Sequence, residues 1–169
     1  INPARYYTAR IDVDATGVRS VDLTGTRPFR RADGTTYPPP AAGDGQAIDP
    51  EELRVDPWTC EHWWAQEGNR APAPVIQPTI QRTDRQGADR GRFPLPENTA
   101  ITPETGPRQN QAVEALTYGA HGSLLTSAVE GPMLQDGPVP TTTAGAFTRV
   151  TTQTRTGRMV GQYAYPLEP

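Results

Sequence analysis

The clearest alternation of apolar and polar residues lies near the N-terminus. Between Tyr7 and Val13 every second residue is apolar, which places these side chains on one face of an extended chain. Thr16-Gly17 offers a turn into a second strand over residues 18–24. The pattern predicts a half-buried antiparallel strand pair within residues 5–24.

Strand signals return in the last third of the chain. Residues 123–129, 146–152 and 158–165 are rich in Thr, Val and Tyr, and Gly- and Pro-containing turns separate them. Short strands at this spacing predict a small antiparallel β-barrel or sandwich. A short helix is expected just before it, from Pro107 to Tyr118. No internal repeat is evident.

Helix signals lie in the first half of the chain. Asp56-Pro57 resembles an N-cap followed by proline at the first helical position. A helix from Trp58 to Glu67 would have about three turns. Cys60, Trp63 and Trp64 would then share one face. We expect the two tryptophans either to form the core of this half or to anchor a neighbouring subunit.

The stretch from residue 69 to residue 111 has no apolar periodicity and contains seven prolines. Structureless runs of this length are uncommon in a compact domain, so we expect an extended arm that lies on other chains. The residues predicted to bind partners are the two tryptophans and four arginines of the arm: Trp63, Trp64, Arg82, Arg85, Arg90 and Arg92.

The expected organisation therefore has three parts. Residues 1–68 form a strand pair plus the short Trp-bearing helix, residues 69–111 form the Pro-rich arm, and residues 112–169 form the small β-domain. The expected fold class is mainly β.

Composition and charge narrow the function classes. Only 34% of the 169 residues are hydrophobic, and no apolar run approaches the ~18 residues of a membrane-spanning helix. The net charge of −3 argues against a dedicated nucleic-acid binder. All 16 basic residues are arginine, which is typical of a high-GC genome or of a surface that needs bidentate contacts. We expect neither nucleic acid nor a membrane as a partner.

No group of residues indicates a catalytic or metal site. On a helix, Cys60 and His62 would point about 200° apart, so they would not form a nucleophile pair. Only His121 could add an imidazole to a zinc site, and the chain has a single cysteine. Asp12 and Asp14 have the spacing of a solvated strand face. We expect no catalytic residue, no metal, no cofactor and no internal disulfide.

The last fifty or so residues carry a resemblance to a known family. Gly119–Gly122, Val129–Gly137, Val139–Phe147 and Arg158–Ala164 follow one another in an order that resembles the small head decoration (capsid cement) proteins of tailed bacteriophages. The resemblance covers about residues 119–165. It implies a non-enzymatic structural protein of the virion that staples capsid or tail subunits, and it carries over no functional residue.

Other function classes stay open beside this one. The first is a secreted or surface-attached binding module of a high-GC bacterium, located outside the cell or on its surface. The second is an accessory subunit that wraps a large cellular complex. An enzyme is the least favoured class. In each non-enzymatic case the expected partners are other protein chains of an assembly, with self-association into a homo-oligomer as a further expectation.

Overall fold

The computed structural model describes residues 3–39, 45–71 and 73–169. Within these ranges the regular elements are ten strands and three 3₁₀ helices, and no α-helix is among them. The strands form one two-stranded and two four-stranded sheets, all antiparallel and none closed into a barrel. The prediction of a mainly β protein is confirmed, but the barrel alternative is wrong. Of the helices in the described part of the chain, none is long and apolar enough to cross a membrane.

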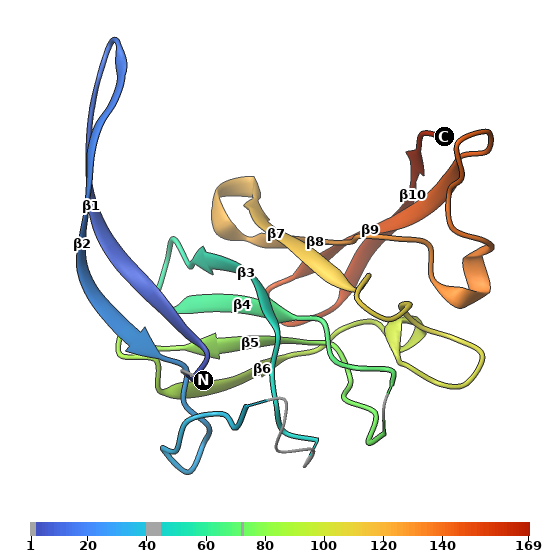
Figure 1. Ribbon diagram of the computed structural model, residues 1–169, viewed down its shortest axis with the longest axis horizontal. Helices are drawn as coiled ribbons and strands as arrows, with labels where there is room; N and C mark the ends of the chain where they lie inside the picture. Colours follow the sequence, from blue (N-terminus) through green and yellow to red (C-terminus); the bar gives the residue numbers. More distant parts are fainter. Residues whose placement is uncertain (1–2, 40–44, 72) are drawn as a thin grey trace.

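The N-terminal strand pair forms as predicted but is not covered. β1 (Arg5–Asp14) pairs with β2 (Gly17–Pro28) around the predicted turn. The hairpin projects away from both four-stranded sheets (Figure 1). Its apolar side chains therefore stay in solvent, with Leu23 69% exposed, and the predicted half-burial is wrong.

Each four-stranded sheet is a meander whose strands follow chain order, which is the topology of a propeller blade. The first sheet consists of β3 (Pro50–Val55), β4 (His62–Gln66), β5 (Thr79–Thr83) and β6 (Asp89–Phe93). The second consists of β7 (Val113–Gly119), β8 (Leu124–Val129), β9 (Ala146–Thr154) and β10 (Met159–Leu167). The 3₁₀ helices η2 (Glu97–Thr99), η3 (Ala120–Gly122) and η4 (Leu134–Asp136) lie in the connections. The first strand of the second sheet, β7, packs against β3 and β4.

The main hydrophobic core lies between the two sheets. The first sheet contributes Trp63, Ala65, Ile80 and Phe93, the second contributes Val113, Leu116, Leu125 and Val129, and the connection after β8 adds Met133. Because side chains alternate along a strand, Trp64 points to the opposite face of the first sheet. There it packs with Phe29 and Tyr37 in a second cluster.

The predicted helix from Trp58 to Glu67 is wrong. Asp56 Oδ1 accepts hydrogen bonds from the backbone N–H groups of Trp58 (2.8 Å) and Thr59 (3.2 Å), as an N-cap residue would. The next residue, Cys60, has a φ of 58°, which no right-handed helix allows. The chain therefore makes a turn and enters β4 as an extended strand.

The range 69–111 is not an extended arm throughout. It contains β5 and β6, which pair with the rest of the first sheet. The prolines come before β5 or after β6 in the sequence and not within either strand, so they interrupt periodicity without preventing sheet formation. The segment after β6 is held by the Arg70 guanidinium, which donates hydrogen bonds to the carbonyl oxygens of Thr102, Thr105 and Pro107. The helix predicted from Pro107 to Tyr118 is also wrong, because an isolated bridge and β7 take its place.

The two sheets share one strand order and several equivalent positions. Glu51 is the second residue of β3, as Glu114 is of β7, and a glutamate directly follows the second strand of each sheet. The turns before the fourth strands also match. The N–H of Gly87 donates to the carbonyl of Asp84 at 3.0 Å, and the N–H of Gly157 donates to the carbonyl of Thr154 at 2.9 Å, three residues back in both turns. These glycines have φ values of 85° and 87°. The structure thus contains a repeat that the sequence did not make evident.

Candidate functional site

Five carboxylates gather where the two sheets meet. Asp49 directly precedes β3, Glu51 lies in β3, and Glu67 directly follows β4. From the second sheet, Glu114 lies in β7 and Glu130 directly follows β8. We call these five residues the carboxylate cluster. It is built from the same end of equivalent strands in both repeats.

The cluster consists of two overlapping triads. Carboxylate oxygens of Asp49, Glu51 and Glu67 lie within 4.8 Å of one another, and those of Glu67, Glu114 and Glu130 do so as well. Glu67 is the shared member and is only 3% exposed. A buried carboxylate surrounded by four others is unfavourable unless protons or a cation offset the repulsion.

Backbone hydrogen bonds fix Glu67 between the sheets. Its Oε1 accepts a hydrogen bond from the N–H of Ala112, which belongs to the second repeat, at 2.8 Å. Its own N–H donates to the carbonyl of Asp49 at 3.3 Å, and the N–H of Glu130 donates to the carbonyl of Ala112 at 2.8 Å. The last two bonds are equivalent in the two repeats. The cluster therefore has a defined backbone frame.

Burial and repulsion within the cluster raise the affinity of Glu114 and Glu51 for protons. Burial, the neighbouring charges of Glu130, Glu51 and Glu67, and a hydrogen bond with Glu67 raise the pKa of Glu114 to about 7. Burial and the charge of Asp49 raise the pKa of Glu51. None of the six ion pairs among the described residues involves a member of the cluster. No arginine of the described chain forms an ion pair that would neutralise it.

The raised pKa of Glu114 predicts lower stability at alkaline pH in the absence of divalent cations. The folded state binds the proton more tightly than the unfolded state, so the destabilisation is absent below about pH 4.5 and complete above about pH 7. We expect a melting temperature several degrees lower at pH 8 than at pH 5 in buffer containing a chelator. Glu114→Gln should remove most of this difference, whereas Glu104→Gln, at an exposed position, should not. An unchanged pH dependence in Glu114→Gln contradicts the assignment.

The donor set of the cluster fits a hard divalent cation. Every member offers carboxylate oxygen, the ligand type that Ca²⁺ and Mg²⁺ prefer. No Cys or His belongs to either triad, so the set lacks the ligands of structural zinc sites. A set of five carboxylates fits the larger and geometrically tolerant Ca²⁺ better than Mg²⁺, which requires a near-ideal octahedron and usually keeps several waters.

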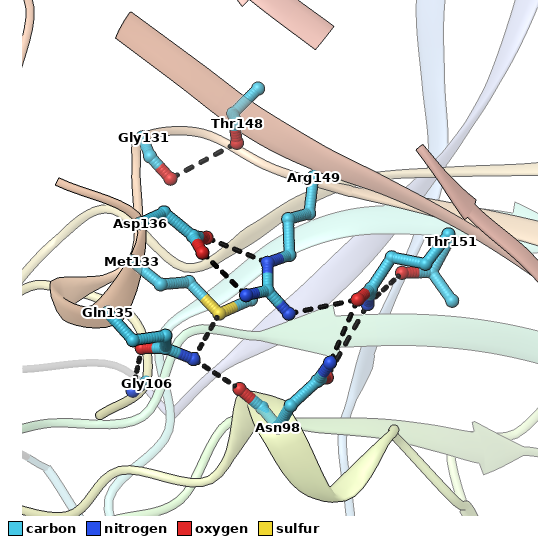
Figure 2. Close-up of polar contacts among 10 residues, drawn as sticks. Asn98, Gly106, Gly131, Met133, Gln135, Asp136, Thr148, Arg149 and Thr151 are labelled. Carbon is cyan, nitrogen blue, oxygen red and sulfur yellow. Dashed lines mark hydrogen bonds and ion pairs between the residues drawn. The ribbon is translucent and has the colours of Figure 1, made fainter. Parts of the chain in front are cut away.

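The second sheet supports Glu130 from outside the cluster. The Thr148 hydroxyl donates to the carbonyl of Gly131 at 3.1 Å (Figure 2) and also contacts the carbonyl of Val129. The residues on both sides of Glu130 are therefore held by one buried side chain. This arrangement restrains the backbone that carries Glu130.

The wider polar network in Figure 2 is structural. Arg149 donates to both carboxylate oxygens of Asp136, at 2.7 and 2.5 Å. The Gln135 side chain accepts from the N–H of Gly106 at 2.9 Å and donates to the carbonyl of Asn98 at 2.8 Å. These groups satisfy one another and tie the loops beside β9 to the sheet. They offer rigid support and few free groups for a ligand.

The residues predicted to bind partners lie elsewhere. Trp63 and Trp64 are buried within the chain, at 2% and 0% exposure. Arg82 lies over the Trp63 ring at 5.6 Å, and Arg90 forms an ion pair with Asp84 at 3.0 Å. The two exposed members without such partners in the described structure are Arg85 and Arg92. Partner binding by these six residues stays a prediction.

The cysteine and the histidines form no joint site. Cys60 lies in the turn before β4, and no hydrogen bond joins it to an imidazole in the described part of the chain. His62 packs edge-on against Tyr6, with ring centroids 4.7 Å apart, and burial lowers its pKa. The carbonyl of His121 accepts a hydrogen bond from the Trp58 indole at 2.8 Å.

None of the five carboxylates is among the site residues predicted from the sequence. Their signal is a repeated spacing, because Glu51 and Glu67 are 16 residues apart, as are Glu114 and Glu130. In both pairs the second glutamate is followed by glycine. Only the sheet topology shows that these two pairs occupy equivalent positions and meet.

The fold and the cluster define a class of protein: repeated four-stranded β-meanders with an acidic site at their junction. The chain belongs to the phytase-like family, whose model, described as "Esterase-like activity of phytase", matches residues 1–169. No curated protein and no solved structure matches the chain.

This family membership overturns the resemblance to phage head decoration proteins, which is wrong. The residues that carried it are mostly Gly, Pro and Asp of turns, and such residues recur wherever short strands are joined. The virion location, the capsid or tail partners and the non-enzymatic role lose this support and stay untested predictions.

Proposed function

We propose that this chain carries the catalytic cation site of an esterase-like enzyme that hydrolyses phosphate esters. The single observation that supports the proposal is the carboxylate cluster centred on buried Glu67. The description of the family supplies the reaction class. The expectation of a non-enzymatic protein is replaced, as a proposal, by this activity.

The chemistry of the cluster favours a phosphate ester over a carboxylic ester. Five carboxylates without a cation would repel a phosphate group. A divalent cation held by them would reverse this effect, because it attracts the negatively charged phosphate more strongly than an uncharged carboxylic ester. Carboxylic ester hydrolysis commonly uses a Ser–His pair, and no Ser–His hydrogen bond joins the residues that the structure describes. A bound cation would supply electrostatic stabilisation of the phosphoryl oxygens and a more acidic water.

The residues of the chain have separable roles in this proposal. Glu67 would belong to two sets of cation ligands, one completed by Asp49 and Glu51 and the other by Glu114 and Glu130. Glu67 is fixed by the Ala112 N–H, and Thr148 restrains the backbone around Glu130. Such outer hydrogen bonds keep ligating carboxylates in one orientation.

The proposal is tested with Glu67→Gln. Glutamine keeps an oxygen that can accept the Ala112 hydrogen bond but removes the central negative charge. With p-nitrophenyl phosphate and Ca²⁺, we expect kcat/KM to fall on the order of 100-fold. Ca²⁺ binding measured by calorimetry should weaken in parallel. A chelator should abolish the activity of the unaltered protein.

Two controls make the result specific. Glu104→Gln removes an exposed carboxylate outside the cluster and should leave both Ca²⁺ binding and activity unchanged. p-Nitrophenyl acetate should be a poor substrate at every cation concentration. Chelator-resistant hydrolysis, or full activity in Glu67→Gln, contradicts the proposal.

A further inference from the structure

We propose that the exposed apolar face of the β1–β2 hairpin binds the same face of a second copy of this chain. Seven apolar side chains form this surface, which we call the hairpin face: Tyr7, Ala9, Ile11 and Val13 from β1, and Val18, Val21 and Leu23 from β2. Residues directly opposite each other in a strand pair point to the same side of the sheet. The register makes three such pairs: Ala9 with Leu23, Ile11 with Val21, and Val13 with Val18.

Two β-bulges keep this face apolar along the hairpin. The register shifts between Thr8 and Ala9 and between Asp12 and Val13, so β2 has one extra residue at each point. Val18 and Val21 are three residues apart and would point to opposite sides of a regular strand. The bulge between them brings both side chains to one side. The register is therefore arranged around an apolar face that the hairpin itself does not bury.

The rest of the described chain does not cover the hairpin face. At the base of β1, the Tyr6 ring packs against Phe29 and His62. Because neighbouring side chains on a strand point to opposite sides, Tyr7 and the hairpin face point away from the first sheet. The six large members are between 50% and 69% exposed, and the hairpin projects from the two four-stranded sheets (Figure 1). The face is therefore open to a second molecule.

The size of the hairpin face suits a symmetric dimer. The exposed fractions of its members correspond to an accessible surface on the order of 600 Å² per chain, at the upper end of the roughly 300–600 Å² typical of the largest patch on a monomer. Two copies together would bury about 1,200 Å², which reaches the lower limit of specific interfaces. A twofold axis lets the same surface serve both chains, and the faces of two twisted sheets pack well when their strands are nearly aligned.

The chemistry of the hairpin favours a second copy over a membrane or a polar partner. Apart from the Tyr7 hydroxyl, which accepts a hydrogen bond from Arg5 Nε at 2.5 Å, no side chain of the face can form hydrogen bonds that would select a polar partner. The charged residues between Tyr7 and Leu23 lie on the other side of the hairpin or at its tip: Arg10, Asp12, Asp14, Arg19 and Asp22. Pairing two hairpin faces therefore leaves these charges in water. The charged tip opposes insertion of the hairpin into a bilayer.

The test is sedimentation equilibrium of the unaltered protein between about 1 and 100 µM, where we expect a reversible monomer–dimer equilibrium. Ile11→Thr combined with Val21→Thr changes one opposite pair of the face and keeps β-branched residues in both strands. A twofold axis places each substitution in the interface twice, so the dimer should weaken by at least about tenfold.

The matched control is Arg10→Thr combined with Asp22→Thr. These two residues are the neighbouring opposite pair, on the other side of the hairpin, and their joint replacement leaves the net charge unchanged. The dimerisation constant should stay the same. Circular dichroism and thermal melts of both double variants check that the strands are intact.

Each other outcome contradicts a stated part of the proposal. A monomer at every concentration overturns it, as does a dimer that the Ile11 and Val21 substitutions do not weaken. Equal weakening in the control overturns the assignment to the hairpin face, and species larger than a dimer overturn the twofold arrangement. A monomer that cosediments with phosphatidylcholine–phosphatidylglycerol vesicles would assign the face to a membrane instead. The proposal does not depend on the proposed hydrolysis, because no member of the carboxylate cluster lies in β1 or β2, and a chelator should leave the dimer unchanged.

Discussion

Replacing Arg155 with alanine is expected to lower the free energy of unfolding by about 3–5 kcal/mol. Arg155 forms an ion pair with Asp56, which is 0% exposed, so alanine leaves a buried carboxylate without its counter-ion. The guanidinium also lies over the rings of Trp58 and Trp63, at 4.5 and 5.5 Å. The melting temperature should fall by roughly 10 °C.

The effect is specific to a buried pair between turns of the two sheets. Burial alone would raise the pKa of Asp56, but hydrogen bonds from Arg155 and from two backbone N–H groups outweigh it and keep the pKa below its usual value. Arg19→Ala, which breaks an exposed pair with Asp14, should cost less than about 1 kcal/mol. Adding Asp56→Asn to Arg155→Ala should restore part of the loss. Equal losses in the two single arginine variants would show that the pair is not important for stability.

Replacing Trp64 with alanine should cost about 3–5 kcal/mol of unfolding free energy. The indole is 0% exposed, stacks on Phe29 with centroids 4.3 Å apart and meets Tyr37 edge-on at 6.0 Å. Alanine removes both ring contacts and leaves a cavity behind the first sheet. Urea unfolding followed by far-UV circular dichroism measures the loss.

A second substitution identifies the cause of that loss. The Trp64 indole nitrogen has no hydrogen-bond partner in the described structure, so Trp64→Phe keeps most of the packing and leaves no partner unsatisfied. It should cost clearly less than Trp64→Ala. Tyr165→Ala, at a side chain that is 58% exposed, should change stability by about 0.5 kcal/mol or less. A Trp64→Phe variant as unstable as Trp64→Ala would contradict ring packing as the cause of the loss.

Local patterns predicted the strands that have a short-range signal. The alternation from Tyr7 to Val13 and the turn at Thr16-Gly17 locate β1 and β2, and the Thr- and Val-rich runs locate β8, β9 and β10. The helix prediction failed because Asp56 makes the same hydrogen bonds in a tight turn that it would make at a helix start. Pairing of β4 with strands on both sides then decided its conformation.

The carboxylate cluster could not be found in the same way. No window of the sequence brings Glu67 near Glu114, and the two meet only because β7 packs beside β3 and β4. A search for equal spacing would have found the two Glu pairs. It would not have shown that Glu67 is buried, which depends on the Ala112 hydrogen bond and on the core between the sheets.

The structural repeat also bears on how such a cluster could arise. A single four-stranded unit carries only its own part of the carboxylates, so duplication of the unit creates the full set at the junction without any new acidic residue. A cation that binds all five carboxylates binds tightly only while the two units are in contact. By thermodynamic linkage, the factor by which that contact strengthens ligand binding is the factor by which the ligand strengthens the contact. Substitutions in the core between the sheets should therefore alter affinity at the cluster even where they touch none of its members.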